Sequence, residues 1–190
     1  MHCLDALQVV QLSTGVRGDL RMTFVIGEKV VYPNQGVGTI ENISSRVFGA
    51  QFERFYLLRL LYSSMTVMVP FSNVTNIGLR KITKTNEVVR VLTFLASGKC
   101  ECPSDWKCRF KDNTDKMQSG SLLQVAEVLK SLLILQQEKP LSFREKKMLD
   151  RSRHLLVSEL GIAKGVREPE AEALIEKALN KAELTMPAVL

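Results

Sequence analysis

The sequence predicts an α+β protein with two domains, an N-terminal five-stranded β-barrel followed by a compact bundle of about five α-helices. A change of periodicity predicts this architecture. Apolar residues recur with a strand-like period of two over residues 24–78, and with a helical period of 3.6 from about residue 80. The 190 residues are 45% hydrophobic and 24% charged, which is enough apolar material for a folded core.

Tight turns separate the expected strands. The turn Pro33–Gly36 has proline early and glycine where positive φ is tolerated. In Met65–Val69, alternate residues are expected on opposite faces of a strand. The expected strands are Phe24–Tyr32, Val37–Phe48, Glu53–Tyr62, Met65–Pro70 and Asn73–Ile77. Short strands with such turns predict a small, strongly bent barrel of the SH3 or Tudor kind, which offers loops and an edge strand instead of a deep pocket.

Capping residues mark the expected helices of the second half. A helix is expected over Asn86–Ser97, with Gly98 as its stop. A second helix is expected from Trp106 to Ser119, with Ser104 as N-cap and Gly120 at its C-cap. A third begins with a capping box at Ser121-x-x-Gln124 and ends at Pro140, and a fourth begins with a capping box at Ser142-x-x-Glu145 and runs to Leu160, where Gly161 closes it. The last helix begins at Glu168-Pro169-Glu170.

These elements divide the chain into four parts. Residues 22–80 are expected to form the barrel domain and residues 81–184 the helical domain, with residues 185–190 as a tail. Residues 1–21 show no clear period. They are interpreted as a loose arm or as a mis-assigned start, with Met22 as the natural first residue.

The stretch Ser104–Asn113 contains the only tryptophan, Trp106. It is followed by basic residues at Lys107, Arg109 and Lys111. An aromatic ring at a helix start, beside cations, can stack on or wedge against a nucleic-acid base while the cations hold phosphates. The alternative is that Trp106 and Phe110, four residues apart, simply pack on the next helix.

The net charge of +6 is concentrated around this stretch. Residues 79–140 carry eleven basic and seven acidic residues, a net of +4. Residues 144–153 form a smaller cluster with five basic and two acidic residues. A basic excess suits a polyanionic partner, although a charge run is commonly a solvated helix face.

The cysteines suggest a competing class, a thiol or zinc protein. Cys100, Cys102 and Cys108 lie close in sequence, but a second C-x-x-C pair is missing and both histidines are distant. Cys108 could also be a reactive thiol whose pKa is lowered by basic neighbours and the helix start. We expect reduced thiols, no metal and no cofactor.

Enzymatic signatures are missing from the sequence. The Gly36-Val37-Gly38 segment lies between strands, without the helix that a nucleotide site requires. No nucleophile–base arrangement or carboxylate pair is apparent, so an enzyme is not expected. The uncharged stretch Leu60–Leu79 contains Pro70 and Gly78, and indicates strands and turns instead of a membrane span. With no convincing signal peptide, a cytoplasmic monomer is expected.

Several motifs resemble the CarD/CdnL family of bacterial transcription regulators. They are G-E-K-V-V-Y-P-N-Q-G-V-G at Gly27–Gly38, M-V-P-F-S-N at Met68–Asn73, S-D-W-K-C-R-F-K-D-N at Ser104–Asn113 and L-S-F-R-E-K-K-M-L-D-R-S-R at Leu141–Arg153. They occur in the family's order, and the resemblance extends from Phe24 to about Lys181.

The resemblance implies a Tudor-like barrel that binds the β subunit of RNA polymerase, and a helical domain that touches promoter DNA at the upstream edge of the melted bubble. Trp106 aligns with a family tryptophan that wedges into the minor groove and slows bubble collapse, with Arg109 and Lys111 at basic positions. The polymerase-facing strand aligns with Thr66, Val67, Met68, Val69 and Pro70, and Arg46 lies at a neighbouring basic position.

The chain departs from some family members at two positions. They carry arginine where this chain has Met68 and Cys108. Met68 can still pack on a partner, and Lys107 could bind the phosphate that Cys108 cannot. DNA binding by one aromatic wedge and a few cations is expected to be weak, salt-dependent and barely sequence-specific. A third interpretation keeps the barrel as a protein-interaction module and makes the helices a scaffold.

Overall fold

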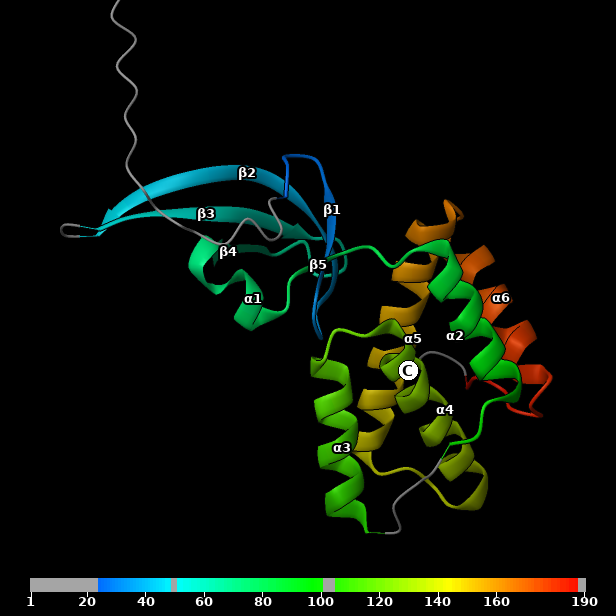
Figure 1. Cartoon of the computed structure of the whole chain (residues 1–190). Coiled ribbons are helices and arrows are strands. Elements are labelled where there is room, and N and C mark those ends of the chain that lie inside the picture. The colour runs from blue at the N-terminus through cyan, green and yellow to red at the C-terminus, as the bar shows by residue number, and fades with distance from the viewer. Residues whose placement is uncertain (1–23, 49–50, 101–104, 188–190) are drawn as a thin grey trace, which may run out of the picture.

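The computed structural model describes residues 24–48, 51–100 and 105–187 (Figure 1). A curved β-sheet forms the N-terminal domain, and a helical bundle lies beside one end of that sheet. The elements, in order, are β1 (Lys29–Tyr32), β2 (Gly36–Phe48), β3 (Gln51–Leu60), β4 (Thr66–Pro70), η1 (Phe71–Asn73), α1 (Val74–Ile77), β5 (Arg80–Lys81), α2 (Thr85–Ser97), α3 (Trp106–Gln118), α4 (Leu122–Glu138), α5 (Phe143–Lys164) and α6 (Glu168–Asn180).

The sheet is antiparallel, with strand order β4-β3-β2-β1-β5. A register shift between Ile40 and Asn42 bends β2, which is the usual effect of a β-bulge. The inward face buries an apolar cluster that includes Val30, Tyr56 and Leu58. The expected fold class, an N-terminal domain of five strands followed by a bundle of five helices, is confirmed in the described part of the chain. Residues 1–21 lie outside the described residues.

The predicted strand at residues 73–77 is not formed, the first strand begins later than predicted, and the third spans Gln51–Leu60 instead of Glu53–Tyr62. Asn73 ends η1, and Val74–Ile77, rich in β-branched side chains, form α1 instead of a strand. Gly78 takes a left-handed φ of 76° and donates its N–H to Val74 and Thr75, which closes a helical turn, while the Val74 side chain enters the sheet core. The fifth strand is Arg80–Lys81 instead. β1 begins only at Lys29, because residues 25–28 make a turn with Gly27 at φ 85°.

The bundle is built around α4, whose buried residues surround most of the helix. The core of the bundle includes Leu129, Leu132, Leu156, Leu160 and Ile175, each fully buried. No helix among residues 24–48, 51–100 and 105–187 is long and apolar enough to cross a membrane. The helices α2, α5 and α6 pack on α4 or on one another, and α3 lies along the other side against α4 (Figure 1).

The helix caps partly follow the predictions. The capping box at Ser142 and Glu145 is confirmed by both of its hydrogen bonds. Ser121 is the N-cap of α4, but its side chain makes no capping hydrogen bond, so a capping box there was wrong. Gly161 does not end α5, which continues to Lys164. A Cβ at Gly161 would lie 3.2 Å from the Val166 carbonyl oxygen, so glycine allows the chain entering α6 to pass close to α5.

The two domains are joined by a buried carboxylate. Glu159 of α5 is 3% exposed and accepts two hydrogen bonds from the guanidinium of Arg80, at 2.6 and 2.9 Å. The backbone N–H and the hydroxyl of Thr83 donate to the same carboxylate, at 3.1 and 2.5 Å. Arg80 also donates to the Gly120 carbonyl after α3. One cluster therefore fixes β5, the α3–α4 turn and α5 together.

A second set of contacts joins the first hairpin to α5. Arg151 donates to the Asn34 carbonyl and to the Gln35 side chain, both at 3.0 Å. The ring of Tyr62, after β3, lies 3.8 Å from the ring of His154. Burial lowers the pKa of His154, which favours the neutral form of the ring that stacks on Tyr62. The relative orientation of the domains is thus set by two groups of contacts on α5, one at Glu159 and one at Arg151 and His154.

Removing one member of the buried pair tests this coupling. Arg80→Met leaves Glu159 buried beside an apolar side chain, and we expect a loss of about 3 kcal/mol in the free energy of unfolding, measured by urea titration. The matched control is Arg167→Met, which removes an exposed ion pair to Glu170, 3.0 Å apart. That change should cost less than about 0.5 kcal/mol. Equal losses for the two variants would contradict a structural role for the Arg80–Glu159 cluster.

Candidate nucleic-acid and protein interfaces

Trp106 is the first residue of α3 and is 57% exposed. The predicted helix start is confirmed, but the N-cap is Asp105 instead of Ser104, which lies outside the described residues. The Asp105 carboxylate accepts the Cys108 N–H at 3.2 Å. Hydrogen bonds from Cys108 lower the pKa of Asp105, so the cap remains charged at neutral pH. The exposure of the ring excludes the alternative in which Trp106 is core packing.

Basic residues near Trp106 differ in their surroundings. Lys107 and Lys111 are exposed and lie one turn apart on α3, so they share a face of the helix. The Lys107 ammonium lies 5.8 Å from the centre of the Trp106 ring. Arg109 is 3% exposed, and its guanidinium donates to Glu145 of α5 at 3.0 Å. The exposed cations are therefore lysines, and Arg109 holds two helices together.

Glu145 connects the start of α3 to the start of α5. Its carboxylate accepts the Ser142 N–H and hydroxyl, at 2.9 and 2.7 Å, in addition to Arg109. Burial raises the pKa of Glu145, but hydrogen bonds from Ser142 and Arg109 outweigh burial and hold the pKa below its ordinary value. The first turn of α3, which carries Trp106, is thereby anchored on the first turn of α5.

A groove of about 820 Å³ runs between α3 and α5. The groove is lined by Phe110 of α3 and by Phe143, Arg144 and Lys147 of α5. Phe143 is 70% exposed, and the Lys147 ammonium lies 4.6 Å from its ring centre. The basic cluster of residues 144–153 was evident from the sequence, but Phe143 was missed. The signal was present, since an aromatic residue directly after a helix N-cap has few ways to be covered.

The cysteine alternatives gain no support from the described residues. Hydrogen bonding to the Asp105 carboxylate, together with the charge of Asp105, raises the pKa of the Cys108 thiol, which is opposite to the direction expected for an activated thiol. Among the residues that the structure describes, no group of three His, Cys, Asp or Glu side chains could hold a metal ion. Cys102 lies outside them.

The predicted polymerase-facing residues lie on β4 and β2. β4 forms one edge of the sheet, because β3 is its only neighbour among the described strands. Met68 of β4 is opposite Leu57 of β3, and Leu57 is opposite Asn42 of β2. Since residues alternate along each strand, this outer face contains Thr66, Met68 and Pro70 together with Arg46.

The remaining two predicted residues point the other way. Val67 and Val69 are opposite Leu58 and Tyr56. Val69 is fully buried in the sheet core, and Val67 packs against that core. Their side chains therefore support the strand from behind, while their backbone belongs to the edge.

Comparison with known proteins gives two family models that match successive parts of the chain. The CarD-like/TRCF RID domain matches residues 24–83, and the CarD C-terminal domain matches residues 80–176. YdeB of Bacillus subtilis (strain 168), whose name describes it as a candidate transcription factor, is 35% identical over 150 residues, which are 79% of this chain and 98% of YdeB. The chain belongs to the CarD family.

Two solved structures are similar to the N-terminal part of this CarD-family chain. CdnLNt from Myxococcus xanthus is 40% identical, covers 34% of this chain and 92% of its own, and has a TM-score of 0.28. The 72-residue N-terminal domain of Myxococcus xanthus CarD is 36% identical, covers 34% of this chain and 85% of its own, and also has a TM-score of 0.28. Membership of the family places this chain among transcription regulators.

The anchoring role of Glu145 predicts a pH dependence. Because its pKa is lower in the folded protein than its ordinary value of 4.5, the stability it supplies is present above pH 4.5 and is lost as the pH falls through the folded-state value. Glu145→Gln should lower the free energy of unfolding by about 2 kcal/mol at pH 7, and the difference from the unmodified chain should shrink on acidification below 4.5.

Urea unfolding at stepwise lower pH measures this difference. Glu176→Gln, an exposed position on α6, is the matched control and should change stability by less than about 0.5 kcal/mol at every pH. A Glu145→Gln effect that stays constant from pH 7 into the acid range would contradict the assigned role.

Proposed function

We propose that this CarD-family chain docks on the β subunit of RNA polymerase through β4 and stabilises the promoter open complex by wedging Trp106 at the upstream edge of the bubble. The observation that carries the proposal is the exposure of Trp106, at 57%, on a helix start that is anchored by a buried ion pair. An exposed aromatic ring at a helix start, beside cations, can wedge or stack against a base while the cations bind phosphates.

The outer face of β4 supports the docking part of the proposal. Edge strands present unpaired backbone groups that can accept another strand, and alternate side chains then give specificity. Met68 is 37% exposed at the middle of this strand and can pack on a partner. Arg46, on the same face, supplies a charge for an acidic partner.

The surface at the start of α3 supports the DNA part. A wedge that unstacks a base step costs a few kcal/mol, and side chains that bind the flanking phosphates offset this cost. Lys107 and Lys111 are exposed on one face of α3, which would let them bind phosphates. The groove lined by Phe143 and Lys147 would extend this surface along α5. In this proposal Arg109 positions Trp106 through Glu145, and the direct phosphate contacts come from the lysines.

Docking and wedging work together in the proposal. A weak DNA contact becomes effective when polymerase binding raises its local concentration. If the chain binds the open complex better than the closed one, it shifts the population toward the open complex by that difference in affinity.

Trp106→Ala tests the wedge. We expect the open complex on a ribosomal RNA promoter to dissociate about tenfold faster than with the unmodified chain, because alanine cannot stack on a base. Binding to the β subunit should be unchanged. The control is Val89→Ala, which removes another exposed apolar side chain, 54% exposed on α2. An unchanged lifetime for Trp106→Ala, with polymerase binding intact, would favour a scaffold role without DNA contact.

The two lysines predict a change in salt dependence. Replacing Lys107 and Lys111 with Gln should lower the slope of log affinity for forked promoter DNA against log salt by about 2, which is roughly one for each lysine that no longer binds a phosphate. The control is the pair Lys164→Gln and Lys177→Gln, which removes the same charge from the last turns of α5 and α6. An equal fall in slope for both pairs would mean that only net charge matters.

A further inference from the structure

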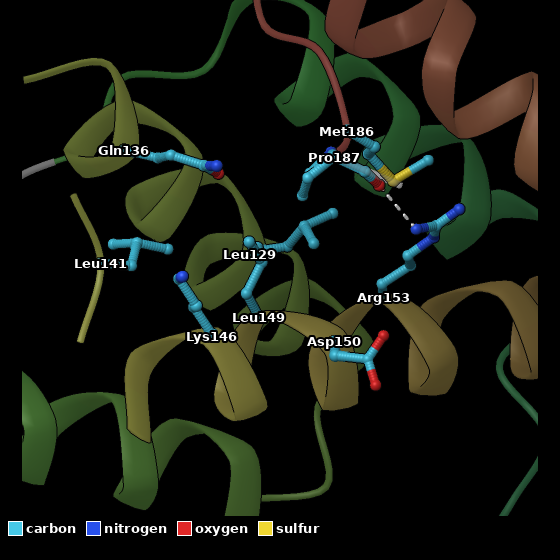
Figure 2. Close-up of a pocket in the computed structure, with 9 residues that line it drawn as sticks. All are labelled: Leu129, Gln136, Leu141, Lys146, Leu149, Asp150, Arg153, Met186 and Pro187. Carbon is cyan, nitrogen blue, oxygen red and sulfur yellow. Dashed lines mark hydrogen bonds between the residues drawn. The ribbon is translucent and has the colours of Figure 1, made fainter. Parts of the chain in front are cut away.

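A cavity of about 190 Å³ lies in the helical domain and shares one lining residue, Asp150, with the groove between α3 and α5 (Figure 2). It lies between α4, the start of α5 and the segment that follows α6. Protein interiors are densely packed, with few voids larger than a water molecule. An apolar cavity of about 150 Å³ in another protein holds benzene. The cavity in this chain therefore has room for a molecule the size of one ring.

Leucine side chains form the inner wall of the cavity. Leu129 is fully buried, and Leu141 and Leu149 are 6% and 5% exposed. Met186 and Pro187 cover the opposite side (Figure 2). Arg153 fixes this cover, because its guanidinium donates to the Pro187 carbonyl at 2.9 Å and to Glu172 at 2.8 Å. The wall is therefore apolar and held in place. The guanidinium of Arg153 is already hydrogen-bonded to Glu172 and to the Pro187 carbonyl.

Two polar side chains from different helices reach the cavity. Gln136 extends from α4 and Lys146 from α5, and Figure 2 shows both ends directed into the space between the helices. Both residues are exposed, so this end of the cavity is open to solvent. Lys146 makes no ion pair with any residue in the described ranges 24–48, 51–100 and 105–187. Asp150, one turn further along α5, points in a different direction from Lys146 and also lines the groove between α3 and α5.

An ammonium and an amide above an apolar wall are complementary to one chemical class. A carboxylate accepts hydrogen bonds from both groups and neutralises the lysine, while an attached ring or branched chain fills the leucine-lined space. We propose that this cavity binds a small monocarboxylic acid with an apolar body. A neutral molecule of the same shape would gain no charge attraction to Lys146, and a cation would be repelled by it.

Benzoate and benzyl alcohol are suitable probes, because they share a ring and differ in charge. The experiment is an NMR titration of the full chain with labelled methyl groups. We expect saturable shifts at Leu129, Leu141, Leu149 and Met186 with a dissociation constant on the order of 1 mM for benzoate, which is typical of so small a ligand. Benzyl alcohol should bind about tenfold more weakly, because it cannot form the charge-assisted hydrogen bond.

A pair of lysine variants completes the test. Lys146→Met keeps the aliphatic stem, and should weaken benzoate about tenfold while leaving benzyl alcohol unchanged. Lys164→Met removes the same charge near the other end of α5 and should leave both affinities unchanged. The proposal is overturned if benzoate gives no saturable shifts at these methyl groups, if the alcohol binds as well as benzoate, or if the two variants weaken benzoate equally.

Discussion

The carboxylate of Glu159 is the group on which the arrangement of the molecule depends. It is buried at the junction of the two domains and accepts hydrogen bonds from Arg80 and Thr83. A buried charge is tolerated only when it is paired and hydrogen-bonded, so each of these donors must stay in place. Because Arg80 belongs to β5 and also donates to Gly120 after α3, the sheet cannot turn relative to α3 and α5 without breaking several of these bonds.

A second buried pair, Arg109 with Glu145, extends this order to the surface. It holds the first turn of α3 on the first turn of α5, and so keeps Trp106 in solvent in one place. The two clusters hold opposite ends of α3. One fixes the end of α3 near the sheet and the other fixes the end that carries the tryptophan. The outer face of β4 and the Trp106 surface are thereby held in one arrangement, which the proposed bridging of polymerase and promoter DNA would require.

Local features were predictable from the sequence where local physics decides them. The Ser142–Glu145 capping box, the helix start at Trp106 and the alternation in Thr66–Val69 depend on neighbours within a few residues, although Met65 lies outside the strand. Prediction failed where contacts with distant parts of the chain determine the local structure. Residues 73–77 have side chains typical of a strand, yet Gly78 and the core position of Val74 make them helical.

Pairs of residues that are distant in the chain could not be predicted from the sequence either. Arg80 and Glu159 are 79 residues apart, and no local pattern links them. Arg109 resembles its basic neighbours in sequence, but its position on the inner side of α3 places it against Glu145. Gly161 was predicted to stop a helix, whereas close passage of the chain entering α6 explains it. In each case the missing information was which helix faces lie against one another.

We expect β4 and Trp106 to be rigidly coupled through Glu159. The most direct test measures how fast the promoter open complex dissociates in the presence of the variant Glu159→Gln. The variant keeps Trp106, both lysines and the outer face of β4, and circular dichroism and β-subunit binding can verify that both domains remain folded. If the coupling is rigid, this variant binds polymerase normally but no longer slows dissociation. Full stabilisation of the open complex by Glu159→Gln would contradict the claim, because the two surfaces would then act without a fixed separation.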